Sequence, residues 1–277
     1  MRKAILLGLS LILIMSAPFA LGTSLEEQLR KTYVGTQRML RHFYDSDALK
    51  FDSSGNPKNT GKEGPWTLFG GVIIDSLQLK SGRLELQGRR RMLVFDGANK
   101  KLLNFALKQT FWIEVQTQEG PGQAAQLSAA LAQVFVPDAD LVSVVPDYWR
   151  DYVARLTGRQ TQGSTCEGPQ ANVARTTPQV PPALRVSSGV AEGLKIHDVT
   201  PIYPMTARQY RIQGDVIVSA MIDKNGDLNR ICIVQPVGAG LDESSVNAIR
   251  QWKYRPYIFH GEPVEVETAI KVQFHMR

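Results

Sequence analysis

The sequence has few of the residues from which catalytic and metal sites are usually built. Its 277 residues contain two cysteines and four histidines, namely His42, His197, His260 and His275. None of the histidines has a metal-ligand spacing such as H-E-x-x-H, and no G-x-S-x-G nucleophile motif is present. We therefore expect a protein that is not an enzyme and that holds no metal and no cofactor.

Clustered charge is also scarce. Lysine and arginine number 32 and aspartate and glutamate 26, so the formal net charge is 32 − 26 = +6. The positive residues are scattered apart from Arg89-Arg90-Arg91, which is typical of a solvated strand end. A nucleic-acid-binding domain carries a continuous basic patch. The charge pattern therefore argues against a nucleic-acid partner.

Long apolar runs are absent except at the amino end. Arg2-Lys3 precedes an apolar stretch over residues 4–15, and Pro18 and small residues at 20–22 follow. This order is that of a secretory signal peptide, which predicts cleavage after residue 22. The alternative is an uncleaved membrane anchor over residues 4–21, because a spanning helix needs roughly 20 apolar residues. Either way, the folded part is expected outside the cytoplasm.

The two cysteines, Cys166 and Cys232, can form one disulfide in an oxidising compartment. The spacing of two cysteines gives no information on their distance in the fold. The alternative is that Cys232 is a buried thiol, because Ile231-Cys232-Ile233 is typical of a core strand. Both interpretations remain open.

Residues 23–156 are predicted to form an N-terminal α+β domain of unknown function with an antiparallel meander sheet. Apolar residues recur at helical spacing over residues 25–44 and again over 123–135 and 148–156. Strand patterns cover residues 72–80, 83–95 and 111–116. A linker is predicted over residues 157–190, because this region is rich in proline, glycine and glutamine and lacks aromatic residues.

The carboxyl-terminal segment, residues 191–277, has the clearest pattern. It predicts a helix over 205–211, strands over 216–222 and 228–234 joined by Asn225-Gly226, a helix over 241–254 and a final strand. From Val264 to Phe274 that final strand alternates apolar with polar residues, as expected for a sheet covered on one face. The predicted fold is α+β, with two helices on a three-stranded antiparallel sheet.

Asp223, Asn225 and Asp227 have the spacing of the first three ligands of an EF-hand calcium loop. Leu228 stands where that loop requires glycine, and Val234 stands where it requires a bidentate glutamate. The segment is therefore interpreted as a hairpin turn, and no metal site is predicted.

Six motifs in order over about 75 residues carry a resemblance to a known family. They are Tyr203-Pro204-x-x-Ala207, Ile212-x-Gly214-x-Val216-x-Val218, Ile222-Asp223-x-x-Gly226, Gly240-Leu241-Asp242, Trp252-Lys253-Tyr254-x-Pro256 and Gly261-x-Pro263-Val264, and Phe274 closes the last strand. In these motifs the segment resembles the C-terminal domain of TonB-family energy transducers. The resemblance covers less than a third of the chain.

The resemblance implies a periplasmic protein that binds TonB-dependent outer-membrane transporters or other envelope proteins. In this family an extended receptor segment, the TonB box, adds as a strand beside the last strand of the domain. By resemblance, the partner-binding edge consists of Val264, Glu265, Val266, Glu267, Thr268, Ala269, Ile270, Lys271, Val272, Gln273 and Phe274. A homodimer is a further arrangement to be considered.

The chain also departs from the family pattern. Family transducers keep an amino-terminal membrane helix in which a polar residue couples to an inner-membrane motor complex. Residues 4–21 contain no histidine and no acidic residue, so contact with the motor is expected only if the leader is retained. The alternative function is that of a periplasmic structural or ligand-binding protein, which uses the C-terminal domain for dimerisation or docking without energy transduction.

Overall fold

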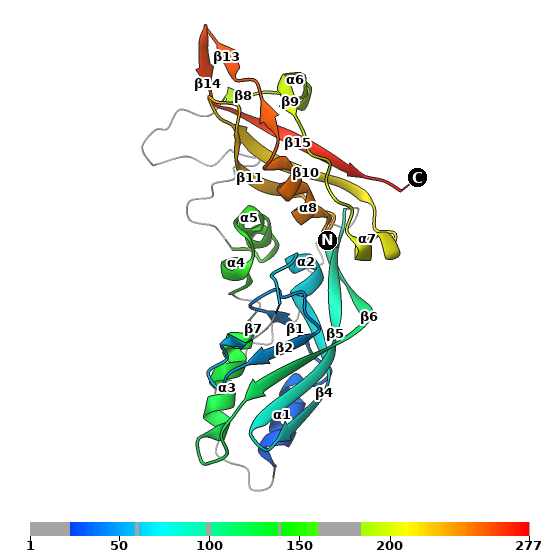
Figure 1. Cartoon of the computed structure of the whole chain (residues 1–277), viewed down its shortest axis with the longest axis vertical. Helices are drawn as coiled ribbons and strands as arrows, with labels where there is room; N and C mark the ends of the chain where they lie inside the picture. The colour runs from blue at the N-terminus through cyan, green and yellow to red at the C-terminus, as the bar shows by residue number, and fades with distance from the viewer. Residues whose placement is uncertain (1–22, 59–60, 98–100, 138–139, 160–183, 277) are drawn as a thin grey trace, which may run out of the picture.

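The computed structural model describes residues 23–58, 61–97, 101–137, 140–159 and 184–276. Two sheets lie at opposite ends of the elongated molecule, and helices α4 and α5 lie between them (Figure 1). The predicted leader, residues 1–22, lies outside the described part. In the described part, no helix has the length and apolar character needed to span a membrane.

The N-terminal sheet has seven strands in the order β3-β2-β6-β5-β4-β1-β7. Their bounds are β1 Gln37–Leu40, β2 Ala48–Phe51, β3 Pro57–Lys58, β4 Gly71–Lys80, β5 Arg83–Asp96, β6 Lys101–Gln116 and β7 Phe135–Val136. The predicted antiparallel meander is found in β4, β5 and β6. The whole sheet is not a meander, because β1 pairs with the outer side of β4 and β2 pairs in parallel with β6.

The first helix is shorter than predicted. Helix α1 spans Leu25–Tyr33, and the side chain of Ser24 caps its amino end by accepting a hydrogen bond from the amide of Glu27. Gly35 follows with a φ of 75°, a left-handed conformation that ends a helix and suits glycine. The apolar residues up to Leu40 are therefore strand residues of β1 and not part of a helix over 25–44.

Helices α1 and α3 cover the N-terminal sheet. Helix α3 spans Gln123–Val134, and its buried side chains share a hydrophobic cluster with Leu29 of α1 and with β4, β5 and β6. This cluster is the hydrophobic core of the N-terminal sheet and its two helices, and its strand residues are the alternating apolar residues of the sequence.

The C-terminal sheet has four strands in the order β11-β10-β15-β8. Their bounds are β8 Leu184–Arg185, β10 Gly214–Ile222, β11 Leu228–Gln235 and β15 Val266–Phe274. Strands β10, β11 and β15 are the predicted antiparallel set. The prediction of three strands is incomplete, because β8 pairs in parallel with β15. Strand β8 lies within the predicted linker, of which residues 160–183 lie outside the described part.

The remaining elements surround this sheet. They are α6 Ser188–Leu194, β9 Lys195–His197, α7 Met205–Gln209, α8 Leu241–Ile249, β12 Lys253–Tyr254, β13 Tyr257–Phe259 and β14 Glu262–Val264. Helix α8 is shorter than the predicted helix over 241–254. The last two residues of that predicted helix form β12, which pairs with β9. Trp252 donates a hydrogen bond from its indole Nε1 to the carbonyl of Val199.

The two halves share one hydrophobic cluster. Helices α2 Trp66–Phe69, α4 Leu141–Val144 and α5 Asp147–Leu156 contribute to it together with the C-terminal sheet and α8. Trp66 and Trp149 make an edge-to-face contact with ring centroids 5.1 Å apart, and α5 packs against β11. The backbone of β5 continues the contact, because the amide of Phe95 donates to the carbonyl of Val237.

Candidate functional site: the β15 edge

Strand β15 presents one buried and one solvated face. Val266, Thr268, Ile270, Val272 and Phe274 are all buried, whereas the residues between them are half-buried or exposed. The predicted single strand over Val264–Phe274 is divided in the structure. Val264 belongs to the β13–β14 hairpin, Glu265 lies outside both strands, and β15 starts at Val266.

The two edges of β15 are used very differently. On one side β15 pairs with β10 over nine consecutive registers, from Val266 to Phe274. On the other side β8 pairs with it at Val266 and Glu267 alone. The carbonyl of Glu267 accepts a hydrogen bond from the amide of Val186 at 3.0 Å, so the backbone groups of Glu267 face this second side.

Along a strand, the backbone N–H and C=O groups of successive residues point alternately to the two sides. Because Glu267 faces away from β10, Ala269, Lys271 and Gln273 do so as well. Within the described residues, β8 is the one strand on this side, and it ends at Arg185, opposite Glu267. The outer edge of β15 from Ala269 to Gln273 therefore carries three N–H and three C=O groups with which no described strand pairs, while α6 packs against β15.

The described start of the predicted edge is already occupied. Arg185 of β8 donates through Nε to Oε2 of Glu267 at 2.8 Å, and Ser219 of β10 donates its hydroxyl to Oε1 of the same carboxylate. An edge that is free from Val264 onward, as the sequence suggested, is therefore not what the structure contains. The sequence offered no signal for β8, because two residues carry no periodicity.

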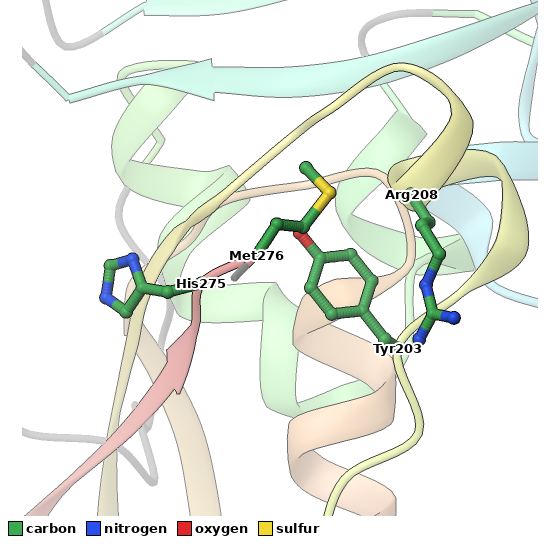
Figure 2. Close-up of a pocket in the computed structure, with 4 residues that line it drawn as sticks. All are labelled: Tyr203, Arg208, His275 and Met276. Atoms are coloured by element: carbon green, nitrogen blue, oxygen red, sulfur yellow. The ribbon is translucent and has the colours of Figure 1, made fainter.

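The carboxyl end of β15 adjoins a small cavity of about 340 Å³, shown in Figure 2. Tyr203, Arg208, His275 and Met276 line it. The Arg208 guanidinium lies 5.5 Å from the centre of the Tyr203 ring, and the Tyr203 hydroxyl donates to the carbonyl of Ile212 at 2.5 Å. The cavity offers one cationic side chain beside an aromatic wall.

The residues of the sequence motifs act mainly in building the fold. Tyr203 packs edge-to-face on Phe274 with ring centroids 5.4 Å apart. The others lie off the outer edge of β15. Ala207, Leu241, Asp242 and Trp252 are buried. Pro204 precedes α7, Gly226 and Gly261 lie in turns, Gly214 starts β10, Pro263 lies in β14, and Pro256 lies between β12 and β13. At Gly226 an added Cβ would stand 1.8 Å from the carbonyl oxygen of Tyr254, so this turn requires glycine.

A buried acidic pair, missed by the sequence analysis, joins the two halves of the chain. Asp242 and Glu243 stand in the first turn of α8, where acidic residues complement the helix dipole, and both are buried. Asp242 accepts hydrogen bonds from the amides of Val237 and Gly238 at 2.8 and 2.6 Å. No sequence signal links these residues to the N-terminal half.

Glu243 makes the contact with that half through Thr67 of α2. The Thr67 hydroxyl lies 3.1 and 3.0 Å from the two carboxylate oxygens and accepts from the amide of Gly240 at 2.9 Å. Burial raises the pKa of Glu243 to about 7. Burial and the neighbouring Glu243 carboxyl also raise the pKa of Asp242 well above its ordinary value. The two halves thus meet at titratable groups.

The remaining predicted sites are placed as follows. In the 223–227 turn, Oδ1 of Asp223 accepts the amides of Asn225 and Asp227, as in an ordinary Asx-type turn. Across the described part of the chain, no group of three metal-ligating side chains is found. Cys232 is buried in β11, and Cys166 lies outside the described residues, so the disulfide stays a prediction.

Comparison with known proteins agrees with the resemblance seen in the sequence. Residues 199–276 match the family described as Gram-negative bacterial TonB protein C-terminal. Protein TonB of Vibrio cholerae serotype O1 is 34% identical over 79 residues, which is 28% of this chain and 32% of that protein. The match therefore spans about a third of the relative's length.

Two solved structures are also similar. The Pseudomonas aeruginosa TonB C-terminal domain has 21% identity and a TM-score of 0.26, over 30% of this chain and 84% of that one. The TonB2 protein from Vibrio anguillarum has 23% identity and a TM-score of 0.26, over 40% of this chain and 99% of that one. The sequence-based recognition of a TonB C-terminal domain is confirmed by the family match and the curated relative.

Proposed function

We propose that this chain, whose residues 199–276 form a TonB C-terminal domain, is a periplasmic, non-enzymatic protein that binds TonB-dependent outer-membrane transporters. It acts as an energy-transducer-like protein or as an adaptor. An extended segment of the transporter adds as a strand along the outer edge of β15. The observation that carries the proposal is the row of outward backbone groups at Ala269, Lys271 and Gln273.

The physical basis of this binding mode is the set of unpaired hydrogen-bonding groups along a sheet edge. Unpaired N–H and C=O groups form a template for another chain, and main-chain bonding makes few demands on the sequence of the visitor. The cationic Arg208 in the cavity at the carboxyl end of β15 adds a contact for an acidic or carbonyl group of the partner. Side-chain selection would thus act at the end of the edge.

The Lys271→Pro variant tests this edge. Its proline removes an outward N–H while the buried face of β15 is unchanged, and proline is tolerated on edge strands. We expect the affinity for a synthetic TonB-box peptide, measured by calorimetry, to fall at least tenfold with a change in unfolding free energy of about 1 kcal/mol or less.

Lys271→Ala is the matched control. It removes the ion pair between Lys271 and Asp215, whose Nζ–Oδ2 distance is 3.2 Å, but keeps the amide. Its affinity should stay within about twofold of the wild type, since an exposed ion pair contributes little. Equal affinity in the proline and alanine variants would contradict pairing at this edge.

The shared hydrophobic cluster favours a role without energy transduction. Such a role is that of an adaptor, or of the second candidate function, a periplasmic structural or ligand-binding protein that uses the C-terminal domain for dimerisation or docking. A transducer must reach from the inner membrane, whereas here the domain packs on its own N-terminal half. Mass spectrometry of the mature amino terminus distinguishes the two. A terminus at Thr23 favours the adaptor, and retention of Met1 favours a membrane-anchored transducer in contact with the motor complex.

A further inference from the structure

The outer edge of β15 carries a short strand from the same chain at its beginning. Strand β8 runs parallel to β15 with Leu184 opposite Val266 and Arg185 opposite Glu267. The next residue, Val186, donates its amide to the carbonyl of Glu267. Two registers of the edge are thus filled by residues 184–186, which we call the self-strand.

The pairing of the self-strand with β15 is short and mostly exposed, although Val186 also packs against the shared hydrophobic cluster. The side chain of Leu184 is 37% exposed, and the Arg185 side chain in the ion pair is 49% exposed. An exposed ion pair and a short ladder contribute weakly, so a segment of this kind opens easily. Its position nevertheless persists, because α6 follows directly with Ser187 as its cap and buries Ala191.

The self-strand and a visiting strand need the same atoms. A strand that pairs along the whole of β15 must bond to the backbone of Glu267, and this carbonyl already accepts the amide of Val186. Two strands cannot occupy one edge register. Building on the proposed function, we propose that residues 184–186 are an autoinhibitory self-strand, which a partner must displace before it can pair along the full edge.

The ion pair of the self-strand also indicates which kind of visiting strand can replace it. When Arg185 leaves, the Glu267 carboxylate, which is 19% exposed, keeps its bond from Ser219 but loses its cation. A visiting strand with arginine or lysine opposite Glu267 replaces the lost charge-assisted bond. The self-strand therefore selects for partners with a basic residue at that register.

The first test uses the full chain without any partner. Val186→Pro removes the donor to Glu267, and Arg185→Glu places two carboxylates side by side. Because β8 pairs with β15 at Val266 and Glu267, the amide of Glu267 lies inside this ladder as well as its carbonyl, and we expect backbone amide exchange at Glu267 to speed up at least tenfold in each variant. The control is Arg30→Glu, which makes the same charge change in an exposed ion pair of α1 and should leave Glu267 unaffected. Unchanged exchange at Glu267 in both test variants would overturn the proposal.

The second test measures competition. A synthetic TonB-box peptide should bind Val186→Pro and Arg185→Glu about three- to tenfold more tightly than it binds the wild type. Equal binding to all three proteins would refute the self-strand as an inhibitor and leave the proposed function intact. Val186 is partly buried, so the surface variant Arg185→Glu guards against a general loss of folding.

A synthetic peptide of residues 184–190 separates the two proposals. If the TonB-box peptide binds none of the proteins, the proposed function fails. The 184–190 peptide should still bind Val186→Pro and slow amide exchange at Glu267. Failure of this peptide to protect Glu267 in the variant would count against a separable self-strand, whatever the transporter peptide does.

Discussion

At the scale of single residues, Glu243 links protonation to the contact between the two halves. Its folded pKa of about 7 lies above the ordinary value of 4.5, because burial disfavours the charged form. The folded state therefore binds more protons than the unfolded state between these two values. The stabilising contribution is complete below about pH 4.5 and is lost as the pH rises through about 7.

Glu243→Gln should remove this dependence. Glutamine keeps an oxygen that accepts from Thr67 and cannot ionise. We expect the difference in melting temperature between variant and wild type to grow in favour of the variant from pH 5 to pH 8. Asp242→Asn is the contrasting variant. The carboxylate of Asp242 accepts hydrogen bonds from two amides, and the asparagine NH₂ group would face one of these donors. This variant should therefore lower the melting temperature at every pH. Parallel pH profiles for Glu243→Gln and the wild type would contradict the assignment.

Gly238 is required by a close approach of backbone. It has a φ of 91°, and an added Cβ would stand 2.2 Å from the carbonyl oxygen of Leu93 in β5. Gly238→Ala should lower the unfolding free energy by more than about 3 kcal/mol, from strain and the clash together. Gly261→Ala is the control, because Gly261 has a φ of 84° with nothing within 4 Å, and should cost about 1 kcal/mol. Equal losses in urea titrations would show that the contact with Leu93 is unimportant.

At the scale of elements, β15 is where periodicity predicted most. The alternation from Val266 to Phe274 identified both the strand and its buried face, because a period of two has one structural solution. Helix ends were less predictable. The apolar patterns over 25–44 and 241–254 continued past the ends of α1 and α8. After α1 the chain turns at Gly35, which has a positive φ. After α8, Trp252 donates a hydrogen bond to the carbonyl of Val199. Strand β8 had too few residues to carry any pattern.

Ile270→Pro tests the inner edge of β15. Ile270 is buried, and its backbone faces β10, so proline removes both a ladder N–H and a core side chain. We expect a loss of at least about 3 kcal/mol in unfolding free energy together with loss of peptide binding. Retention of stability close to that of Lys271→Pro would show that the assignment of inner and outer backbone groups is reversed.

At the scale of the whole molecule, the main feature that sequence reasoning could not reach is the shared core. Each half has its own apolar pattern, and no local signal says that α5 packs against β11 or that Trp66 and Trp149 share a cluster with residues of the other half. Such contacts depend on how the finished elements fit. For the same reason the hydrogen bond between Thr67 and Glu243, which lie 176 positions apart, could not be predicted from the sequence.

Trp149→Ala should reveal the coupling of the halves. This side chain is fully buried in the shared cluster, and its removal should cost about 3–5 kcal/mol. Because α5 packs against β11, backbone amide exchange should accelerate in Leu228–Gln235 as well as around residue 149. Acceleration confined to residues 23–158 would show that the two halves unfold independently.

The packing of α5 against β11, which joins the two halves, has a mechanical consequence. A pull on a peptide attached to β15 would be carried through the C-terminal sheet into α5 and α2, since these elements are packed together. Stretching a single molecule between that peptide and the amino end should therefore give an early force peak for separation of the halves.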